Sequence, residues 1–87
     1  MYYTKLIPVK DFCEFHQVER TFVFNLEEMG VIQFVVEKEI PHIPYEMVFR
    51  VERLMRIQRD FEVRIQDLDL IDELLTKIDE LERKLGE

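Results

Sequence analysis

The side chains able to do covalent or metal chemistry are few, and their spacing assembles no complete site. Cys13 and His16 form a Cys-x-x-His pair, which is half of a zinc site, and no second pair with ligand spacing follows. Serine is absent, and Gly30 and Gly86 are too few to build a phosphate-binding loop. We therefore expect Cys13 to be a core residue, and a protein that is not an enzyme and holds no metal or cofactor.

Basic side chains recur at every third position of one predicted helix, which is the pattern of a phosphate-binding row. The row consists of Arg50, Arg53, Arg56 and Arg59. An alternative is a solvated face paired locally at i,i+4, through Glu46–Arg50 and Glu52–Arg56. The whole chain carries a net charge of −7. It lacks the basic footprint on which phosphate binding depends, so its charge favours a basic protein partner or simply solubility.

Size and composition predict one small folded domain. The 87 residues are 47% hydrophobic and 36% charged, and a chain this short buries little surface, so oligomerisation is expected. No apolar run approaches the roughly 18 residues of a membrane span. The N-terminal stretch MYYTKLIPVK lacks the features of a secretory signal, and the single cysteine fits a reducing compartment. We expect a cytoplasmic protein without a membrane partner.

The first half of the sequence predicts two short helices joined by a tight connection. After an extended lead-in at residues 6–9, a helix runs from Asp11 to about His16, with Phe12, Cys13 and, as a third candidate, Phe15 turned inward. A second helix spans residues 18–32, and its inner arc comprises Val18, Phe22, Leu26 and Met29, with Gly30 as the helix stop.

The outer face of this second helix is unusual because it combines an aromatic ring with acids. Phe24 lies there beside Glu27 and Glu28. One interpretation is an aromatic anchor for a partner, rimmed by charge. The other is that Phe24 tucks under the hairpin or the terminal helix as an ordinary core residue.

The second half predicts a hairpin and two longer helices. Residues 31–40 are rich in β-branched and aromatic side chains around a charged tip, and Pro41 and Pro44 are expected to close the hairpin because proline cannot donate to a central ladder. A third helix follows to about Asp60, with Val48, Val51, Leu54, Met55 and Phe61 as its buried side. Residues 62–65 form a joint.

The terminal helix, from about residue 66 to 85, has the pattern of a coiled coil. The predicted dimerisation stripe is Ile71, Leu74, Leu75, Ile78, Leu81 and Leu85, widened by Leu68. A stripe that continues to Leu85 is more typical of pairing with a second copy than of packing on its own domain. The opposite face carries Asp69, Asp72, Glu73 and Glu80, which are a second candidate partner-binding face or a solvated exterior.

The predicted fold is mainly α with a small β-hairpin. A winged helix-turn-helix covers about residues 6–43 of a single 1–87 domain, a third helix covers 44–61, and an amphipathic, coiled-coil-like dimerisation helix covers 66–85.

The ordered motifs resemble the MerR-like winged helix-turn-helix superfamily. Residues 7–13, IPVKDFC, followed by VERTFVFNLEEMGVI at 18–32, are similar to its opening, in which the second helix reads V-S-x-R-T-L-R-Y-Y-E-x-x-G-L-I. FEVRIQDLDLI at 61–71 resembles the joint into the final helix. Length, hairpin placement and the short terminal helix resemble one branch in particular, the chaperone modulator family CbpM.

The departures from the DNA-binding pattern are informative. Glu19 stands at the usual serine cap, and the two arginines that approach DNA correspond to Thr21 and Phe24. Asn25-Leu26 replaces Tyr-Tyr. Side chains suited to phosphates and base edges are therefore missing, and acids on this face would repel a duplex.

The resemblance implies a function in chaperone regulation. CbpM-like proteins bind the J-domain of a CbpA-type DnaJ homologue and restrain its stimulation of Hsp70, and an acidic competitor suits the basic helical face of a J-domain. The expectation is a dimeric, non-enzymatic inhibitor of such a J-domain co-chaperone. The alternatives are a MerR-like DNA-binding regulator that uses the hairpin and the arginine row, and a bare dimerisation module.

Overall fold

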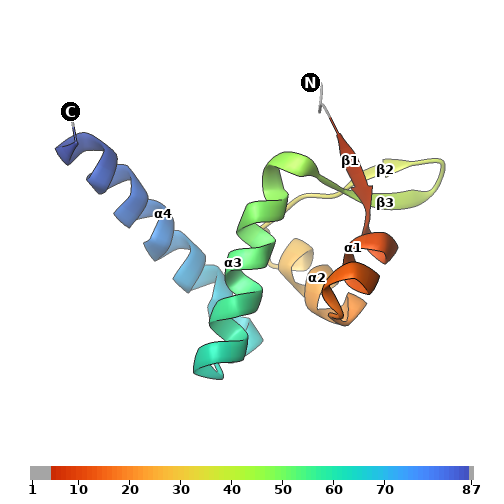
Figure 1. Ribbon diagram of the computed structural model, residues 1–87, viewed down its shortest axis with the longest axis horizontal. Coiled ribbons are helices and arrows are strands. Elements are labelled where there is room, and N and C mark those ends of the chain that lie inside the picture. The colour runs from red at the N-terminus through yellow and green to blue at the C-terminus, as the bar shows by residue number, and fades with distance from the viewer. Residues whose placement is uncertain (1–4, 87) are drawn as a thin grey trace.

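Residues 5–86 are described by the computed structural model, in which a small sheet lies at one edge of the molecule beside the helices (Figure 1). The elements in chain order are β1 (Leu6–Pro8), α1 (Val9–His16), α2 (Arg20–Glu28), β2 (Val35–Glu37), β3 (Ile40–Pro44), α3 (Tyr45–Phe61), a 3₁₀ turn η1 (Ile65–Asp67) and α4 (Leu68–Leu85). This order is that of a winged helix-turn-helix followed by two longer helices, as predicted. The start of the stretch MYYTKLIPVK lies outside the described residues.

The helix-turn-helix is formed by α1 and α2, whose inner faces are apolar. Gln17 adopts a left-handed conformation with φ 55°, and the N–H of Val18 donates to the carbonyl of Cys13 at 3.0 Å, which ends α1. Phe12 and Cys13 are buried, as predicted. The prediction for Phe15 is wrong because its side chain is 83% exposed, about 110° around the helix from the centre of the buried arc.

Gly30 ends α2, as the sequence predicts. Its φ is +82°, its N–H donates to the carbonyl of Glu27 at 3.0 Å, and the N–H of Val31 donates to the carbonyl of Leu26 at 2.9 Å. These two bonds satisfy carbonyls that a helix end leaves without partners, in the pattern of a Schellman motif. The chain therefore turns sharply toward the hairpin, and α2 is shorter than the predicted 18–32.

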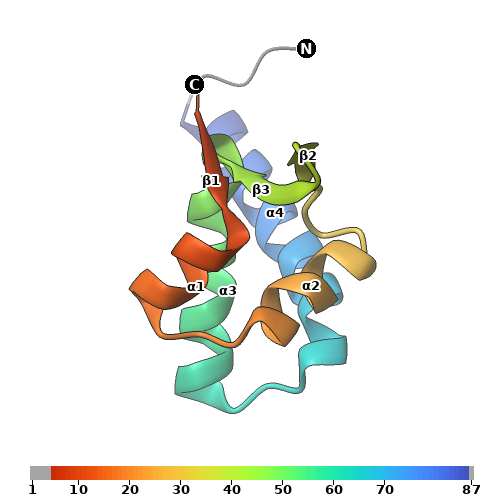
Figure 2. The ribbon, with the colours of Figure 1, turned by 90° about the vertical axis from the view of Figure 1, so that its right-hand side faces the viewer.

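The sheet has the strand order β1-β3-β2, and both pairings are antiparallel (Figures 1 and 2). Pro44 is the last residue of the central strand β3 and closes the hairpin as predicted, whereas Pro41 lies inside β3, so the prediction for Pro41 is wrong. The geometry tolerates both prolines, since Pro41 pairs only with Val36 of β2 and Pro44 is the last residue of β3. The charged tip is confirmed as a two-residue turn with positive φ at Lys38 and Glu39.

The third helix, α3, runs from Tyr45 to Phe61 and lies behind α1 in Figure 2. Val51 and Leu54 are fully buried on its inner face. The prediction for Phe61 is wrong: it is 73% exposed, because α3 continues beyond the elements that could cover its last turn. Glu62, with φ 53°, then breaks the helix, which confirms the predicted joint.

The last helix, α4, leaves the joint and diverges from α3 (Figure 1). Leu68 at its first turn is fully buried, whereas Leu85 at its far end is 87% exposed. Most of α4 therefore lies outside the core.

The core joins both halves of the chain. Its buried members are Val9, Phe12, Cys13, Phe22, Val23, Leu26, Val31, Ile32, Ile43, Val51, Leu54 and Leu68. Val23 is fully buried although it lies outside the predicted inner arc of α2, because β3 and α3 enclose a wider part of that helix than a single arc.

Candidate functional site

The outer face of α2 carries Phe24 partly in solvent. Its ring lies 5.1 Å from the ring of Phe34, centroid to centroid, in an edge-to-face arrangement at 83°, and 42% of Phe24 remains exposed. Edge-to-face pairing is a favoured geometry for aromatic rings. Phe24 therefore contacts the segment leading into the hairpin, as one interpretation predicts, but it is not a fully buried core residue. The partner-anchor interpretation stays a prediction.

Acidic side chains lie next to Phe24. Glu27 is half-buried and Glu28 is exposed, one turn further along α2. Toward the start of the helix, the hydroxyl of Thr21 donates to the carboxylate of Glu19 at 3.3 Å. Arg20 is exposed and is the one basic residue of α2. This face offers a DNA backbone little positive charge.

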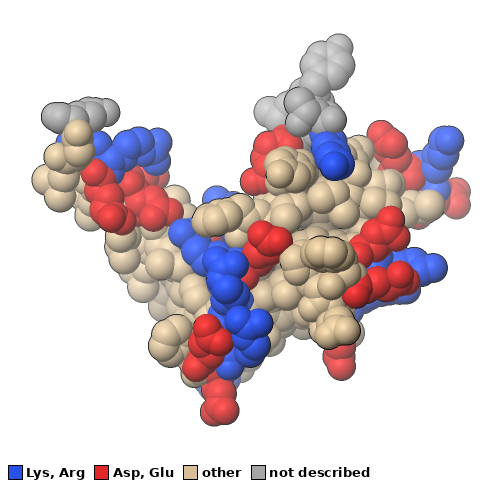
Figure 3. Space-filling view, in the orientation of Figure 1, with Lys and Arg blue, Asp and Glu red and all other residues tan. Residues whose placement is uncertain are grey.

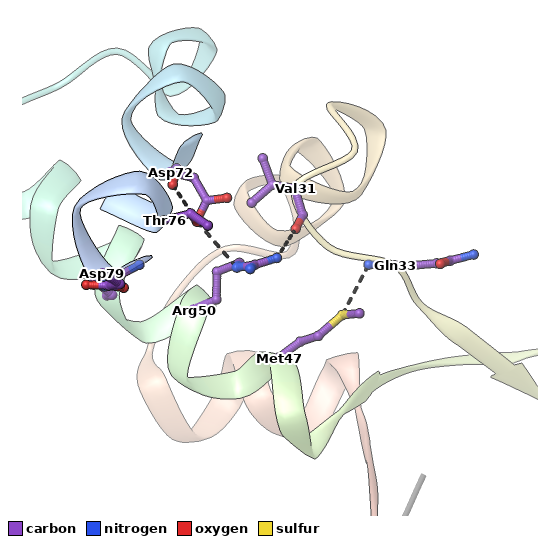
Figure 4. A network of polar contacts seen from close by, with 8 residues as sticks. Val31, Gln33, Met47, Arg50, Asp72, Thr76 and Asp79 are labelled. Atoms are coloured by element: carbon purple, nitrogen blue, oxygen red, sulfur yellow. Dashed lines mark hydrogen bonds and ion pairs between the residues drawn. The ribbon is translucent and has the colours of Figure 1, made fainter. Parts of the chain in front are cut away.

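The arginine row on α3 is largely used within the molecule. Arg50 donates to the carbonyl of Val31 at 3.1 Å and lies 3.4 Å from the carboxylate of Asp72 (Figure 4). Arg53 pairs with Asp79 at 3.2 Å. Two members of the row therefore hold α4 and the loop after α2.

The remainder of the row is more open. Arg56 and Arg59 are exposed, and Arg59 pairs with its neighbour Asp60 at 3.1 Å. Basic side chains gather along α3 in the space-filling view, with acids on either side (Figure 3). The predicted local pairs Glu46–Arg50 and Glu52–Arg56 are not among the ion pairs of residues 5–86, and Glu52 instead lies 3.3 Å from His16 of α1.

The predicted acidic face of α4 is smaller than expected. Asp69, Glu73 and Glu80 are exposed, but Asp72 is only 9% exposed, so its predicted place on the outer face is wrong. The reason is that Arg50 lies opposite Asp72 across the α3–α4 contact and draws the carboxylate inward.

The apolar stripe of α4 is divided between two environments. Ile71 and Leu75 are half-buried. The outer members are exposed: Leu74 is 52%, Ile78 49%, Leu81 58% and Leu85 87% exposed. Among residues 5–86 the outer part of the stripe has no apolar cover.

The residues with possible metal or nucleophilic chemistry do not converge. Among the described residues no three His, Cys, Asp or Glu side chains are arranged to hold a metal ion. Cys13 is buried in the core, where burial raises the pKa of its thiol and the nearby Arg20 lowers it less. His16 contacts Glu52, and Nδ1 of His42 lies 2.8 Å from the carbonyl of Ile40 in its own hairpin. No helix in residues 5–86 has both the length and the apolar composition to cross a membrane.

Comparison with known proteins places this architecture in a family. A family model described as MerR HTH family regulatory protein matches residues 7–87, nearly the whole chain. The chain belongs to the MerR helix-turn-helix family. The match identifies the family as a whole and does not single out the chaperone modulator branch. No curated protein and no solved structure matches the chain.

One feature of this MerR-family chain is missing from the sequence predictions. It is the Arg50–Asp72 pair, which has no signal in the sequence, since the two residues are on separate helices and neither position departs from its local pattern. A contact of Phe24 with the hairpin is among the predicted interpretations, but the sequence did not identify Phe34 as its partner.

Proposed function

We propose that this MerR-family chain is a non-enzymatic regulator that binds the J-domain of a DnaJ/CbpA-type co-chaperone and restrains its stimulation of Hsp70. The observation that carries the proposal is the outer face of α2. Where the DNA-reading pattern has two arginines, this chain presents exposed Thr21 and half-exposed Phe24. The motifs at residues 7–13, 18–32 and 61–71 that resemble the CbpM branch add support.

The charge distribution favours a protein partner over DNA. Counterion release from phosphates drives duplex binding and needs free basic side chains. The net charge here is −7, and Arg50 and Arg53 are engaged by Asp72 and Asp79. A basic surface such as that of a J-domain is steered toward an acidic protein of this kind.

A homodimer formed through α4 is part of the proposal. Leu74, Ile78, Leu81 and Leu85 alternate in the a/d spacing of a coiled coil and are about half exposed or more. A second copy would cover them with an identical stripe, which gives an isologous contact. The partner-binding face is then either the outer face of α2, with Phe24, Glu27 and Glu28, or the exposed acids Asp69, Glu73 and Glu80 of α4.

The test is direct binding. The purified chain is titrated with an isolated J-domain by calorimetry, and J-domain-stimulated ATPase activity of Hsp70 is followed in parallel. We expect binding and a fall of the stimulated rate toward the basal rate. No heat at about tens of micromolar, equivalent to less than roughly 6 kcal/mol of binding free energy, would reject the proposal. A duplex shifted in a gel at low salt, with no J-domain binding, would favour the DNA-binding alternative.

A further inference from the structure

The outer face of α2 and the hairpin form one continuous apolar strip. Phe24 and Phe34 are in edge-to-face contact at 5.1 Å, so the strip crosses from the helix to the segment before β2. Val36, two residues beyond Phe34, is 65% exposed. Side chains two apart along an extended chain leave the same side of it, which places Val36 next in the strip. At that exposure most of the Val36 side chain is not packed within residues 5–86.

The surroundings of this strip are acidic. From residue 19 to residue 39 the charged side chains are Glu19, Arg20, Glu27, Glu28, Glu37, Lys38 and Glu39, five acids against two bases. Glu27 and Glu28 lie three and four residues after Phe24 and flank it on the helix. Glu37 pairs with Ile40 and projects from the other face of the hairpin, so it does not belong to this rim. The strip therefore has an apolar centre with Glu27 and Glu28 at its edge.

The matching ligand has the opposite arrangement, with apolar side chains on one face and lysines or arginines beside them. An amphipathic helix offers both, because residues three and four apart line one face and their neighbours flank it. We propose that the surface formed by Phe24, Phe34 and Val36, with Glu27 and Glu28 at its edge, binds a single basic amphipathic helix. This proposal rests on the proposed function for the identity of the protein that supplies the helix, a J-domain.

The geometry favours this surface over the acids of α4. Asp72 is buried and cannot contact a partner, which leaves Asp69, Glu73 and Glu80 as a row of exposed charges. Exposed charges alone give little net affinity, whereas an apolar centre that becomes dry on binding supplies most of it. The α2–hairpin surface has such a centre.

Two matched pairs of variants test the proposal with an isolated J-domain as the probe. Val36→Ser removes an apolar contact from the strip, and Ile40→Ser is its control. Ile40 is 51% exposed on the same hairpin, and it pairs with Glu37 rather than Pro41, so it projects from the other face. Glu28→Lys reverses a rim charge, and Glu73→Lys makes the same reversal on α4. Circular dichroism checks that each variant is folded.

We expect Val36→Ser to weaken J-domain binding about fivefold and Glu28→Lys about tenfold, with both controls within about twofold of the unaltered chain. Weakening by Glu73→Lys with no effect of Glu28→Lys or Val36→Ser would overturn the surface while leaving the proposed function intact. An unaltered chain that fails to bind the J-domain would overturn both. If Val36→Ser fails to fold, Glu28→Lys decides alone, since Glu28 is exposed and makes no ion pair within residues 5–86. A change in self-association rather than in J-domain binding would assign the surface to a second copy and reject the proposal.

Discussion

Replacing Ile78 with aspartate is expected to abolish self-association without unfolding the chain. Ile78 is 49% exposed in the middle of the outer stripe of α4, between Leu74 and Leu81. In a dimer it would meet the same stripe of a second copy, where a carboxylate would lose its hydration without gaining a counter-charge. Burying an unpaired carboxylate costs several kcal/mol, which is on the order of the cost of removing one partner from a buried ion pair.

The magnitude of the association follows from the exposed fractions. Leu74, Ile78, Leu81 and Leu85 together leave the equivalent of about two and a half side chains in solvent on each copy. Covering both stripes at about 2 kcal/mol for each whole side chain gives roughly 10 kcal/mol. The loss of translational and rotational freedom costs about 4 kcal/mol or more. The stripe alone therefore supports a dimer with a Kd of about tens of micromolar or weaker.

Sedimentation velocity over a concentration series measures this equilibrium. We expect the unaltered chain to shift from monomer to dimer as its concentration rises through about tens of micromolar, and Ile78→Asp to remain monomeric. The matched control is Glu80→Asp. It also introduces aspartate, which has a low helix propensity, into the turn of α4 that contains Ile78, but at an exposed position outside the stripe. An unaltered chain that is monomeric at about 1 mM, or an Ile78→Asp chain that still dimerises, would refute the reasoning.

Further predictions concern the core, the thiol and the hairpin tip. Phe12→Ala should lower the free energy of unfolding by about 3–5 kcal/mol, and Phe15→Ala by less than about 1 kcal/mol, as measured by urea denaturation at a fixed protein concentration, because Phe12 is 3% and Phe15 83% exposed. Cys13 should be alkylated slowly in the native state and rapidly in urea; equal rates would contradict its burial. Burial raises the pKa of the Cys13 thiol in the folded chain above its value in the unfolded chain. The stabilisation from the buried neutral thiol is therefore complete below the pKa of the unfolded chain's thiol, and it should decline as the pH rises from that pKa to the pKa of the folded chain's thiol. Unfolding measured at a series of alkaline pH values will show this decline. Replacing Lys38-Glu39 by Asn-Gly should raise the melting temperature, by an amount equivalent to about 1 kcal/mol, because both positions have positive φ; an unchanged or lower melting temperature would show that the turn is not strained.

Local rules predicted the elements well, because each has a strong signal within a few residues. The period of 3.6 located α1 and α2, and the lack of a Cβ at Gly30 fixed the end of α2. The predictions that depend on where an element lies within the whole fold were less successful. Pro41 lies inside the central strand, because β1, a three-residue segment read only as an extended lead-in, adds to the outer side of β3.

Faces were harder to predict than elements because a helical wheel does not show what lies beside the helix. Phe15 points away from the buried arc of α1, and Phe61 is the last residue of α3, beyond the elements that cover this helix. Phe24 was placed on the correct face, yet its contact with Phe34 depends on the path of the chain after Gly30. Asp72 was predicted to be exposed because acidic side chains usually are. It is buried because Arg50, on another helix, lies next to its carboxylate.

The docking of α4 explains why its apolar stripe remains free. The helix contacts α3 with Leu68 at its base and then with polar side chains, Asp72 toward Arg50 and Asp79 toward Arg53. At 100° per residue, Asp72 and Asp79 lie roughly 140° around the helix from the centre of the outer stripe.

If α4 were rotated to bury that stripe against α3, its leucines would contact Arg50 and Arg53. Asp72 would then be exposed to solvent and would lose its ion pair with Arg50. Leu68 and Ile71, which pack in and against the core, together with the two ion pairs set the rotation of α4 and keep the stripe on the outside, where a second copy can cover it. This stripe belongs to α4, whereas the strip of Phe24, Phe34 and Val36 belongs to α2 and the hairpin, so the two proposed contacts use different residues.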